Sequence, residues 1–326
     1  MPDRLRMGLL GCASIAWRRT LPALVTADGV ELTVVASRDP DKARRFAERF
    51  GGTPVHGYEA LLERADVDAV YIPLPTGMHA EWVSRALSAG KHVLAEKPLT
   101  GTADEAQRLV AQASRAGRWL QENFMFLHHG QHVAVRKLVA DGRIGTPRAF
   151  TAAFGIPGLD PSDVRYRPEL GGGSLLDVGV YPIRSAQLLL SPELEVAGSV
   201  LRQDEATGVD VGGGALLVAP DGATAELSFG FERSYRCRYT LWGSAGHLTL
   251  DRAFTPGPAA QPVIRIESQD HAEEITLPAD HQFRNIIDTF ARSIRDGADF
   301  APEAEAMVRQ ARLVDEIRNR AVRRTA

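Results

Sequence analysis

The chain has 326 residues, of which 44% are hydrophobic and 24% charged, and its formal net charge at pH 7 is −3. This length is enough for two domains with separate hydrophobic cores, and the composition is ordinary for a soluble globular protein. The small negative charge provides no general attraction to nucleic acid or to anionic membranes, so we expect neither as a partner.

The cysteine content and the start of the chain favour a cytoplasmic protein. Only Cys12 and Cys237 are present, too few for a disulfide framework. The chain starts Met-Pro-Asp-Arg-Leu-Arg, without the apolar segment of a signal peptide. No apolar run approaches the roughly 18 residues that a membrane-spanning helix needs.

The first third of the chain alternates short apolar runs with helical patterns, which predicts βαβ units and a parallel sheet. Strands are expected at residues 7–10, 32–36, 69–72, 92–95 and 119–121. Helices are expected at residues 40–50, 77–89 and 102–116. Asp39 is a suitable N-cap for the first of these, with Pro40 in its first turn.

After residue 126 the pattern changes to longer β-like runs joined by tight turns, which favours antiparallel strands. We expect a helix at residues 132–140 and two helices at 281–295 and 302–323. Strands are expected at residues 148–154, 213–218, 224–231, 238–242, 247–250, 263–266 and 274–277.

The predicted fold class is therefore α/β, with a Rossmann domain over residues 1–126 and a second α/β domain over residues 127–326. The second domain would contain an open, mostly antiparallel sheet for substrate binding and oligomerisation. Because an open sheet face needs covering, we expect a homo-oligomer, a dimer or tetramer, packed sheet to sheet.

A glycine turn follows the first strand. Gly11-x-Ala13-x-x-Ala16 is a relaxed form of the dinucleotide-binding pattern G-x-G-x-x-G/A. Gly11 permits the tight turn, Ala13 permits close approach of a pyrophosphate, and Ala16 packs the helix on the sheet. A purely structural turn is the alternative. The residues expected to contact the cofactor here are Gly11, Cys12, Ala13, Ser14, Ile15 and Ala16.

The end of the second strand indicates which dinucleotide binds. An acidic residue there would bind the ribose hydroxyls of NAD, but this strand ends in Ser37 and Arg38. A hydroxyl and a guanidinium suit a 2′-phosphate, so NADPH/NADP+ is the predicted cofactor. Asp39 would be turned away as a helix cap, and a solvated Arg38 remains the alternative.

The fourth long strand leads into Glu96-Lys97-Pro98. Ligands of open α/β sheets bind at the carboxyl ends of the strands. Lys97 is therefore a candidate donor to a substrate oxygen near the nicotinamide, and a structural ion pair with Glu96 is the alternative.

Several segments across nearly the whole chain resemble the Gfo/Idh/MocA family, named for glucose–fructose oxidoreductase, inositol dehydrogenase and a rhizopine-catabolism protein. The matching segments are the Gly8–Ala16 turn, Pro73-Leu74-Pro75-Thr76-Gly77-Met78-His79, Ala95-Glu96-Lys97-Pro98, Glu122-Asn123-Phe124-Met125-Phe126 and the run from Gly171 to Pro182. The resemblance implies a Lys97–Pro98 bond that is commonly cis.

In the second domain, Asp177 and Tyr181 are four residues apart and lie on one face if they open a helix. The three glycines before them would allow the backbone to approach a ligand closely, and a flexible loop is the alternative. Many family dehydrogenases have histidine where this chain has Tyr181. Tyrosine here is similar to the branch with glucose–fructose oxidoreductase and the sugar-nucleotide 3-ketoreductases, and a neutral phenol suits donation to a carbonyl undergoing reduction.

The resemblance therefore implies an NADPH-dependent sugar 3-ketoreductase of deoxysugar biosynthesis for antibiotics. It would reduce the C-3 carbonyl of a dTDP-3,4-diketo-2,6-dideoxyhexose. Lys97 and Tyr181 are the expected catalytic groups, with Lys97 as the first candidate for the proton donor and Tyr181 as the alternative. Lys97, Asp177 and Tyr181 are the expected substrate contacts.

The resemblance also implies further cofactor contacts, at Tyr58, Leu74, His79, Glu96, Lys97 and Arg165. Arg165 lies on a loop that reaches towards the nicotinamide in relatives, and a solvent-facing arginine is the alternative. His128, His129 and His132 lack an accompanying set of carboxylates, so we expect no catalytic metal.

Two other functions are compatible with these residues. One is an NAD(P)-dependent sugar or cyclitol dehydrogenase that works in the oxidative direction. The other is a non-catalytic, cofactor-sensing regulator, which would predict loss of the catalytic lysine or its acid partner.

Overall fold

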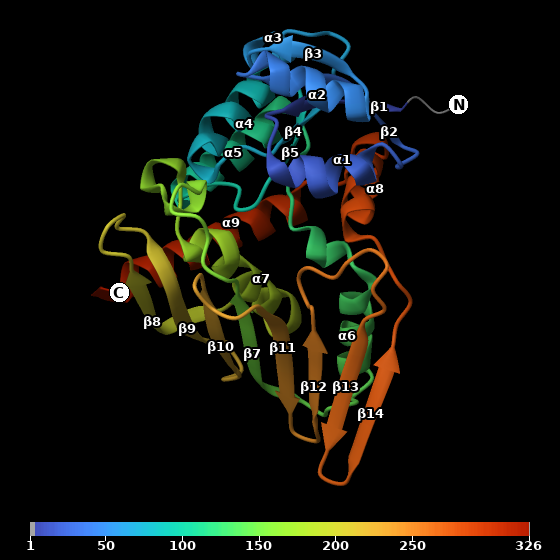
Figure 1. Cartoon of the computed structure of the whole chain (residues 1–326). Helices are drawn as coiled ribbons and strands as arrows, with labels where there is room; N and C mark the ends of the chain where they lie inside the picture. The colour runs from blue at the N-terminus through green and yellow to red at the C-terminus, as the bar shows by residue number, and fades with distance from the viewer. Residues whose placement is uncertain (1–3, 326) are drawn as a thin grey trace. The chain divides into compact units, whose positions relative to one another are not determined.

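The computed structural model describes residues 4–325 and divides the chain into two compact units (Figure 1). The first unit contains the chain up to His128 together with Gln282–Val308. The second contains His129–His281 and the chain from Arg309 onward. Among the described residues, no helix is both long and apolar enough to cross a membrane.

A parallel six-stranded sheet forms the centre of the first unit. Its order is β3-β2-β1-β4-β5-β6, and all neighbouring strands run parallel. This is the Rossmann order, which reverses between β1 and β4 and creates a ligand-binding crevice there. The strands are β1 (Leu5–Leu10), β2 (Val30–Ser37), β3 (Thr53–His56), β4 (Ala69–Ile72), β5 (His92–Ala95) and β6 (Leu120–Glu122).

The helices of this unit begin and end at recognisable capping residues. The Asp39 carboxylate accepts hydrogen bonds from the backbone N–H groups of Asp41 and Lys42, as predicted for an N-cap. Thr102 caps another helix, which ends at the left-handed Gly117. The helices are η1 (Ala16–Thr20), α1 (Leu21–Leu24), α2 (Pro40–Phe50), α3 (Glu59–Leu62), η2 (Thr76–Met78), α4 (His79–Ser88), α5 (Ala103–Ala116), η3 (Met125–His128) and α8 (Gln282–Arg295).

Helix α8 belongs to the first unit although it follows the second sheet in sequence. Its buried face contains Phe283, Ile286, Ile287 and Phe290, and it packs against α1, η1 and β2. Helix α9 (Ala301–Arg320) starts in the first unit and ends in the second. The division therefore differs from a single cut after residue 126, because burying the apolar face of α8 returns the chain to the first unit.

A nine-stranded sheet forms the second unit, in the order β14-β13-β12-β11-β7-β10-β9-β8-β15. The β7–β10 and β8–β15 pairs are parallel and the other neighbours are antiparallel, which confirms the expected mostly antiparallel sheet. The strands are β7 (Pro147–Gly155), β8 (Glu195–Gln203), β9 (Asp210–Val218), β10 (Thr224–Gly230), β11 (Arg236–Gly243), β12 (His247–Asp251), β13 (Val263–Ser268), β14 (His271–Thr276) and β15 (Val322–Thr325).

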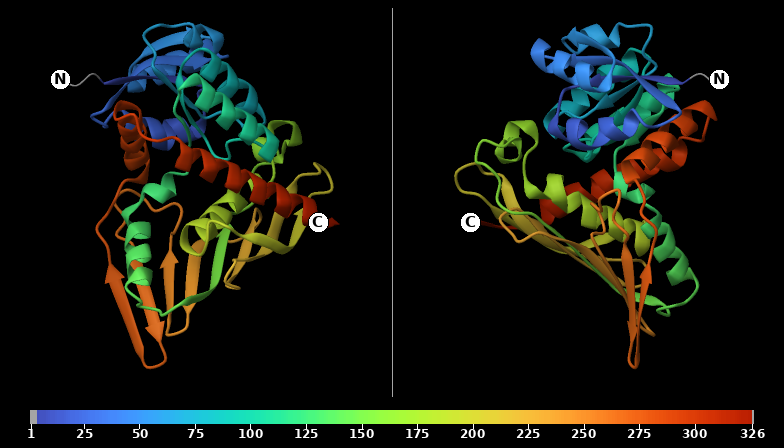
Figure 2. Two further views of the ribbon diagram at one scale, coloured as in Figure 1. Left: turned by 180° about the vertical axis from the view of Figure 1, so that it is seen from behind. Right: turned by 45° about the vertical axis from the view of Figure 1, so that its right-hand side comes forward.

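Helices α6 (Gly130–Ala140) and α7 (Val180–Leu189) pack against this sheet, and Figures 1 and 2 show both beside its strands. Buried side chains such as Phe150, Phe154, Tyr239 and Leu241 form the core on the inner face. The short helices η4 (Val164–Tyr166), η5 (Pro168–Leu170) and η6 (Leu175–Gly179) lie between β7 and α7 in sequence.

The outer face consists of the residues that alternate with this core. Thr151 on β7 has Glu226 and Thr240 as its neighbours on β10 and β11. Trp242 is 66% exposed and Leu216 is 41% exposed on the same face. Because side chains alternate along each strand, these residues project away from the helix-covered side.

Candidate functional site

The glycine turn connects β1 to η1. Gly11 has φ of +110°, and a Cβ atom there would lie 2.6 Å from Leu74 Cδ2. Its N–H donates to the Ala36 carbonyl at the end of β2 (3.0 Å). Ala16 is fully buried against the sheet, while Ser14 is exposed where helix N–H groups lack intrahelical partners. The turn therefore has the form of an anion-binding helix start, and Leu74 packs directly on it.

The residues expected to select the cofactor lie together at the end of β2. Burial raises the pKa of Tyr58, while the charge and hydrogen bond of Arg38 oppose the rise. Burial also raises the pKa of Cys12 to about 11, and a hydrogen bond to Ser37 opposes it. Asp39 Oδ1 accepts both hydrogen bonds from the α2 backbone, so this carboxylate serves as a helix cap. Arg38 supplies an exposed guanidinium at this strand end, and Lys42 and Arg45 add positive charge near Cys12.

Lys97 follows the carboxyl end of β5 and is half-buried. The Lys97–Pro98 peptide bond is cis, as the resemblance implied. The Glu122 carboxylate accepts a hydrogen bond from the Leu99 N–H at 2.7 Å. The segment that carries Lys97 is therefore fixed on its C-terminal side.

His79 is fully buried behind this segment. Its Nδ1 lies 2.9 Å from the Pro98 carbonyl oxygen and its Nε2 lies 2.7 Å from the Leu74 carbonyl oxygen. Burial lowers the pKa of His79, and the neighbouring carbonyl groups oppose the effect. The ring therefore connects the loops after β4 and β5, and a role towards the cofactor would act through Leu74 and Pro98.

Glu96 lies in a hydrogen-bonded network at the same sheet edge. Its Oε1 accepts from Tyr71 Oη at 2.7 Å and from Asn123 Nδ2 at 2.6 Å. Tyr71 Oη is also 2.9 Å from Thr20 Oγ1. Burial raises the pKa of Glu96, and these hydrogen bonds lower it in part. Sequence reasoning missed Thr20, Tyr71 and Asn123, because a buried strand tyrosine and a helix threonine carry no functional signal by themselves.

Tyr181 lies at the start of α7, where it is 5% exposed. Its ring makes an edge contact with Phe154 at a centroid distance of 5.2 Å and packs against Phe254 at 5.7 Å. The phenol is therefore held by aromatic neighbours on β7 and after β12, which restricts its rotation.

Arg165 and Asp177 form an ion pair within the second unit. Arg165 Nε donates to Asp177 Oδ2 at 2.6 Å, and Arg165 Nη1 donates to Asp163 Oδ1 at 3.2 Å. The Asp177 carboxylate is the main cause of the raised pKa of Arg165. The structure thus gives Arg165 a definite role in orienting Asp177.

The three glycines before Asp177 serve this arrangement. A Cβ on Gly172 would lie 2.5 Å from the Arg165 carbonyl oxygen. Gly173 has φ of +114°, and its N–H donates to the same oxygen at 2.9 Å. These glycines therefore allow their segment to pack closely against the backbone of Arg165.

Among the three neighbouring histidines, His132 has two structural contacts. His132 Nε2 is 2.9 Å from the Ala253 carbonyl oxygen, and its Nδ1 is 3.0 Å from Tyr239 Oη. Burial lowers the pKa of His132 to about 3. Within residues 4–325, no group of three or more His, Cys, Asp or Glu side chains is arranged to hold a metal ion.

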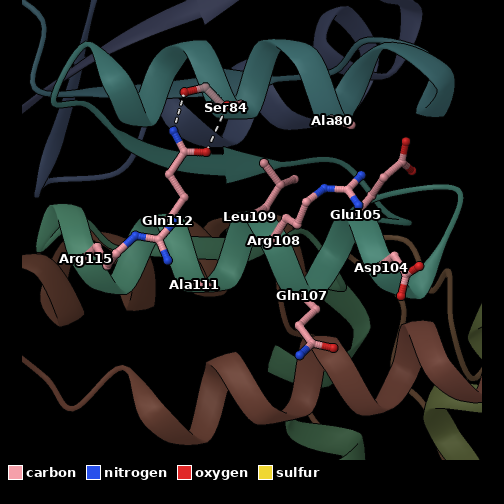
Figure 3. A pocket seen from close by; sticks show the side chains of 10 residues that line it. All are labelled: Ala80, Ser84, Asp104, Glu105, Gln107, Arg108, Leu109, Ala111, Gln112 and Arg115. Atoms are coloured by element: carbon pink, nitrogen blue, oxygen red, sulfur yellow. Dashed lines mark hydrogen bonds between the residues drawn. The ribbon is translucent and has the colours of Figure 1, made fainter.

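A groove of about 640 Å³ lies between α4 and α5 (Figure 3). Ser84 Oγ donates to Gln112 Oε1 at 2.8 Å, and Gln112 Nε2 donates to the Ser84 carbonyl at 2.9 Å across it. None of the candidate site residues lines this groove, so we assign it no role in cofactor or substrate binding.

Comparison with known proteins extends over the whole chain. Residues 5–124 match the model of the oxidoreductase family, NAD-binding Rossmann fold, and residues 132–249 match the GFO/IDH/MocA C-terminal domain. A dTDP-3,4-didehydro-2,6-dideoxy-alpha-D-glucose 3-reductase from Actinomadura kijaniata is 53% identical over 96% of this chain and 95% of its own. An enzyme of the same name from Saccharopolyspora spinosa is 52% identical over 97% of each chain.

The fold also matches a crystal structure. KijD10, a 3-ketoreductase from Actinomadura kijaniata in complex with NADP and TDP-benzene, superposes with a TM-score of 0.98. The two are 52% identical, and the match covers 99% of this chain and 100% of that chain. The chain therefore belongs to the GFO/IDH/MocA oxidoreductase family.

Proposed function

We propose that the protein is an NADPH-dependent 3-ketoreductase that reduces the C-3 carbonyl of a dTDP-3,4-diketo-2,6-dideoxyhexose. The observation that carries this function is Lys97 at the carboxyl end of β5, in a Rossmann sheet whose strand β2 ends in Ser37 and is followed by Arg38. The 3-reductases of Actinomadura and Saccharopolyspora, alike over nearly their full length, support the same substrate class.

The residues at the end of β2 fit a cofactor with a 2′-phosphate. The Ser37 hydroxyl and the Arg38 guanidinium would hold that phosphate, while the Asp39 carboxylate is committed to capping α2. The Gly11 turn and the start of η1 would hold the pyrophosphate. When bound, NADPH supplies the hydride.

Charge develops on the carbonyl oxygen during the reduction, and the protein has two groups suited to it. The Lys97 ammonium stabilises that oxygen and donates the proton, with Tyr181 as the second hydrogen-bond donor and the alternative acid. Asp177, oriented by Arg165, would bind a sugar hydroxyl or orient Tyr181. These roles are assigned to each residue from its chemistry and its place in its own unit.

Replacement of Arg38 by alanine tests the cofactor assignment. Loss of a charge-assisted hydrogen bond to a phosphate costs about 1.5–3 kcal/mol, so kcat/KM for NADPH should fall roughly 10- to 100-fold. The value for NADH should change little, as measured by initial rates at 340 nm. Arg44→Ala, on the following helix α2 and paired with Asp41, is the matched control. Equal losses with both cofactors would contradict a 2′-phosphate contact.

Lys97→Ala and Tyr181→Phe test the catalytic assignment. A positioned acid contributes about 10²–10⁴-fold, so Lys97→Ala should lose activity in that range and Tyr181→Phe less. Initial rates, thermal melting and NADPH affinity should be measured together, so that folding and binding are separated from chemistry. Unchanged turnover in the double variant would show that the chemistry lies elsewhere.

The direction of the reaction distinguishes a ketoreductase from the two alternatives, a sugar or cyclitol dehydrogenase and a non-catalytic regulator. With NADPH and an enzymatically generated diketo-sugar nucleotide, we expect turnover that exceeds oxidation of free myo-inositol or glucose with NADP+. Faster oxidation of the free sugars would favour a cyclitol or sugar dehydrogenase. NADPH binding without turnover on either class would favour the regulator.

A second copy of this chain is the partner we propose for the outer face of the nine-stranded sheet. The middle of that face has small side chains, Ala149, Thr151 and Ala153 on β7, flanked by the exposed Trp242 and Leu216. An uncovered sheet face with exposed apolar groups is suited to an isologous interface.

Thr151→Arg tests this interface, because a long side chain at the centre of a close sheet contact would hold the two faces apart, even when its charge is paired with the adjacent Glu226. Light scattering should give a multiple of 35.4 kDa for the wild type and 35.4 kDa for the variant. Val133→Arg, at a 66% exposed position on α6, is the matched control and should leave the mass unchanged. A wild-type protein that remains monomeric at micromolar concentration would contradict the proposal.

A further inference from the structure

Four side chains from separate elements of the first unit form one hydrogen-bonded chain. Thr20 lies at the end of η1, Tyr71 is on β4, Glu96 follows β5 and Asn123 follows β6. The contacts are 2.9 Å between Thr20 and Tyr71, 2.7 Å between Tyr71 and Glu96, and 2.6 Å between Asn123 and Glu96. Thr20 and Asn123 are 0% exposed and Tyr71 is 1% exposed, whereas Glu96 is only partly buried, so the chain runs from the interior of the unit to the partly exposed residue next to Lys97.

The donors and acceptors in this chain have a single consistent assignment. Because Tyr71 donates its one hydroxyl proton to Glu96, its oxygen accepts from the Thr20 hydroxyl. Asn123 donates through its amide nitrogen to the same carboxylate oxygen. Both donors therefore point at Glu96 Oε1, which favours the ionised carboxylate and opposes the effect of burial.

The backbone on both sides of Lys97 is held as well. The Glu96 N–H donates to the Ile72 carbonyl at 3.0 Å on one side. On the other side, the Leu99 N–H donates to Glu122 and the Pro98 carbonyl contacts His79. A lysine side chain has several rotatable bonds, so a fixed neighbouring negative charge restricts where its ammonium group is stable.

We propose that Tyr71 and Asn123, with Thr20 behind Tyr71, are positioning residues that act through Glu96 on Lys97. They fix the Glu96 carboxylate as a counter-charge beside the lysine and so maintain its ammonium group where the carbonyl oxygen of the substrate is protonated. The inference rests on the proposed role of Lys97 as the acid. It adds three residues, none of which needs to touch the cofactor or the sugar.

Two substitutions separate the hydrogen bond from the charge. Tyr71→Phe retains the Glu96 charge and removes one donor, whereas Glu96→Gln retains an acceptor oxygen for both donors and removes the charge. Loss of a hydrogen bond to a charged group is worth about 1.5 kcal/mol, so we expect Tyr71→Phe to lower kcat about tenfold. The KM and the dissociation constant for NADPH should stay within about twofold, because Tyr71 itself is not among the residues assigned to the cofactor.

A double-mutant cycle then tests whether the residues act as one unit. If Tyr71 acts through Glu96, adding Tyr71→Phe to Glu96→Gln should cost clearly less than it does in the wild type. In a Lys97→Ala background, single-turnover rates should not change further with Tyr71→Phe. Thr20→Ser should retain wild-type kcat, whereas the isosteric Thr20→Val should lower it.

Tyr239→Phe is the control, because it also removes a buried tyrosine hydroxyl, one that bonds His132 in the second unit. It should leave kcat unchanged. Unchanged kcat in Tyr71→Phe, or additive losses in the cycle, would overturn the inference while leaving the catalytic role of Lys97 intact. Full activity of Lys97→Ala would instead overturn the role of Lys97, and the inference with it.

Discussion

The partly buried carboxylate of Glu96 is the constraint on which the catalytic end of the first unit depends. A carboxylate inside a protein is costly unless donors face it, and here Tyr71 and Asn123 supply them from the strands on both sides. Because Tyr71 also contacts Thr20, the helix after the glycine turn is tied to the segment that carries Lys97. The sites assigned to pyrophosphate and to the acid thus share one polar network.

The two units use the same principle, in which one charged group is oriented by others so that a ligand meets a preformed arrangement. In the first unit, capping of α2 commits Asp39 and leaves Arg38 as the charge at the end of β2. In the second, Arg165 holds Asp177, and the glycines allow the Arg165 backbone to pack against the start of the helix that carries Tyr181. In both units, a side chain of a recognised motif is oriented by a residue outside the motifs: Glu96 by Tyr71, and Asp177 by Arg165.

The sequence predicted the elements with strong periodicity or capping signals and missed those without them. The Rossmann strands β1, β2, β4, β5 and β6, the Asp39 cap and the mostly antiparallel second sheet were predicted and are confirmed. Strand β3 was missed because it contains Pro54 and is an exposed edge strand. Strand β8 was missed because Gly198 lies at a break in its register. The contacts of His79 and Glu96 could not be predicted either, because they join residues that are distant in sequence, and periodicity carries no information about such pairs.

The most direct test of the account is the position of the transferred hydride. NADPH deuterated at C-4 of the nicotinamide should be incubated with the enzyme and a freshly generated dTDP-3,4-diketo-2,6-dideoxyhexose, and the product examined by NMR. The account predicts a new hydroxyl at C-3 of the sugar with deuterium on that carbon. Deuterium at C-4, or consumption of NADPH without label in the sugar, would contradict it.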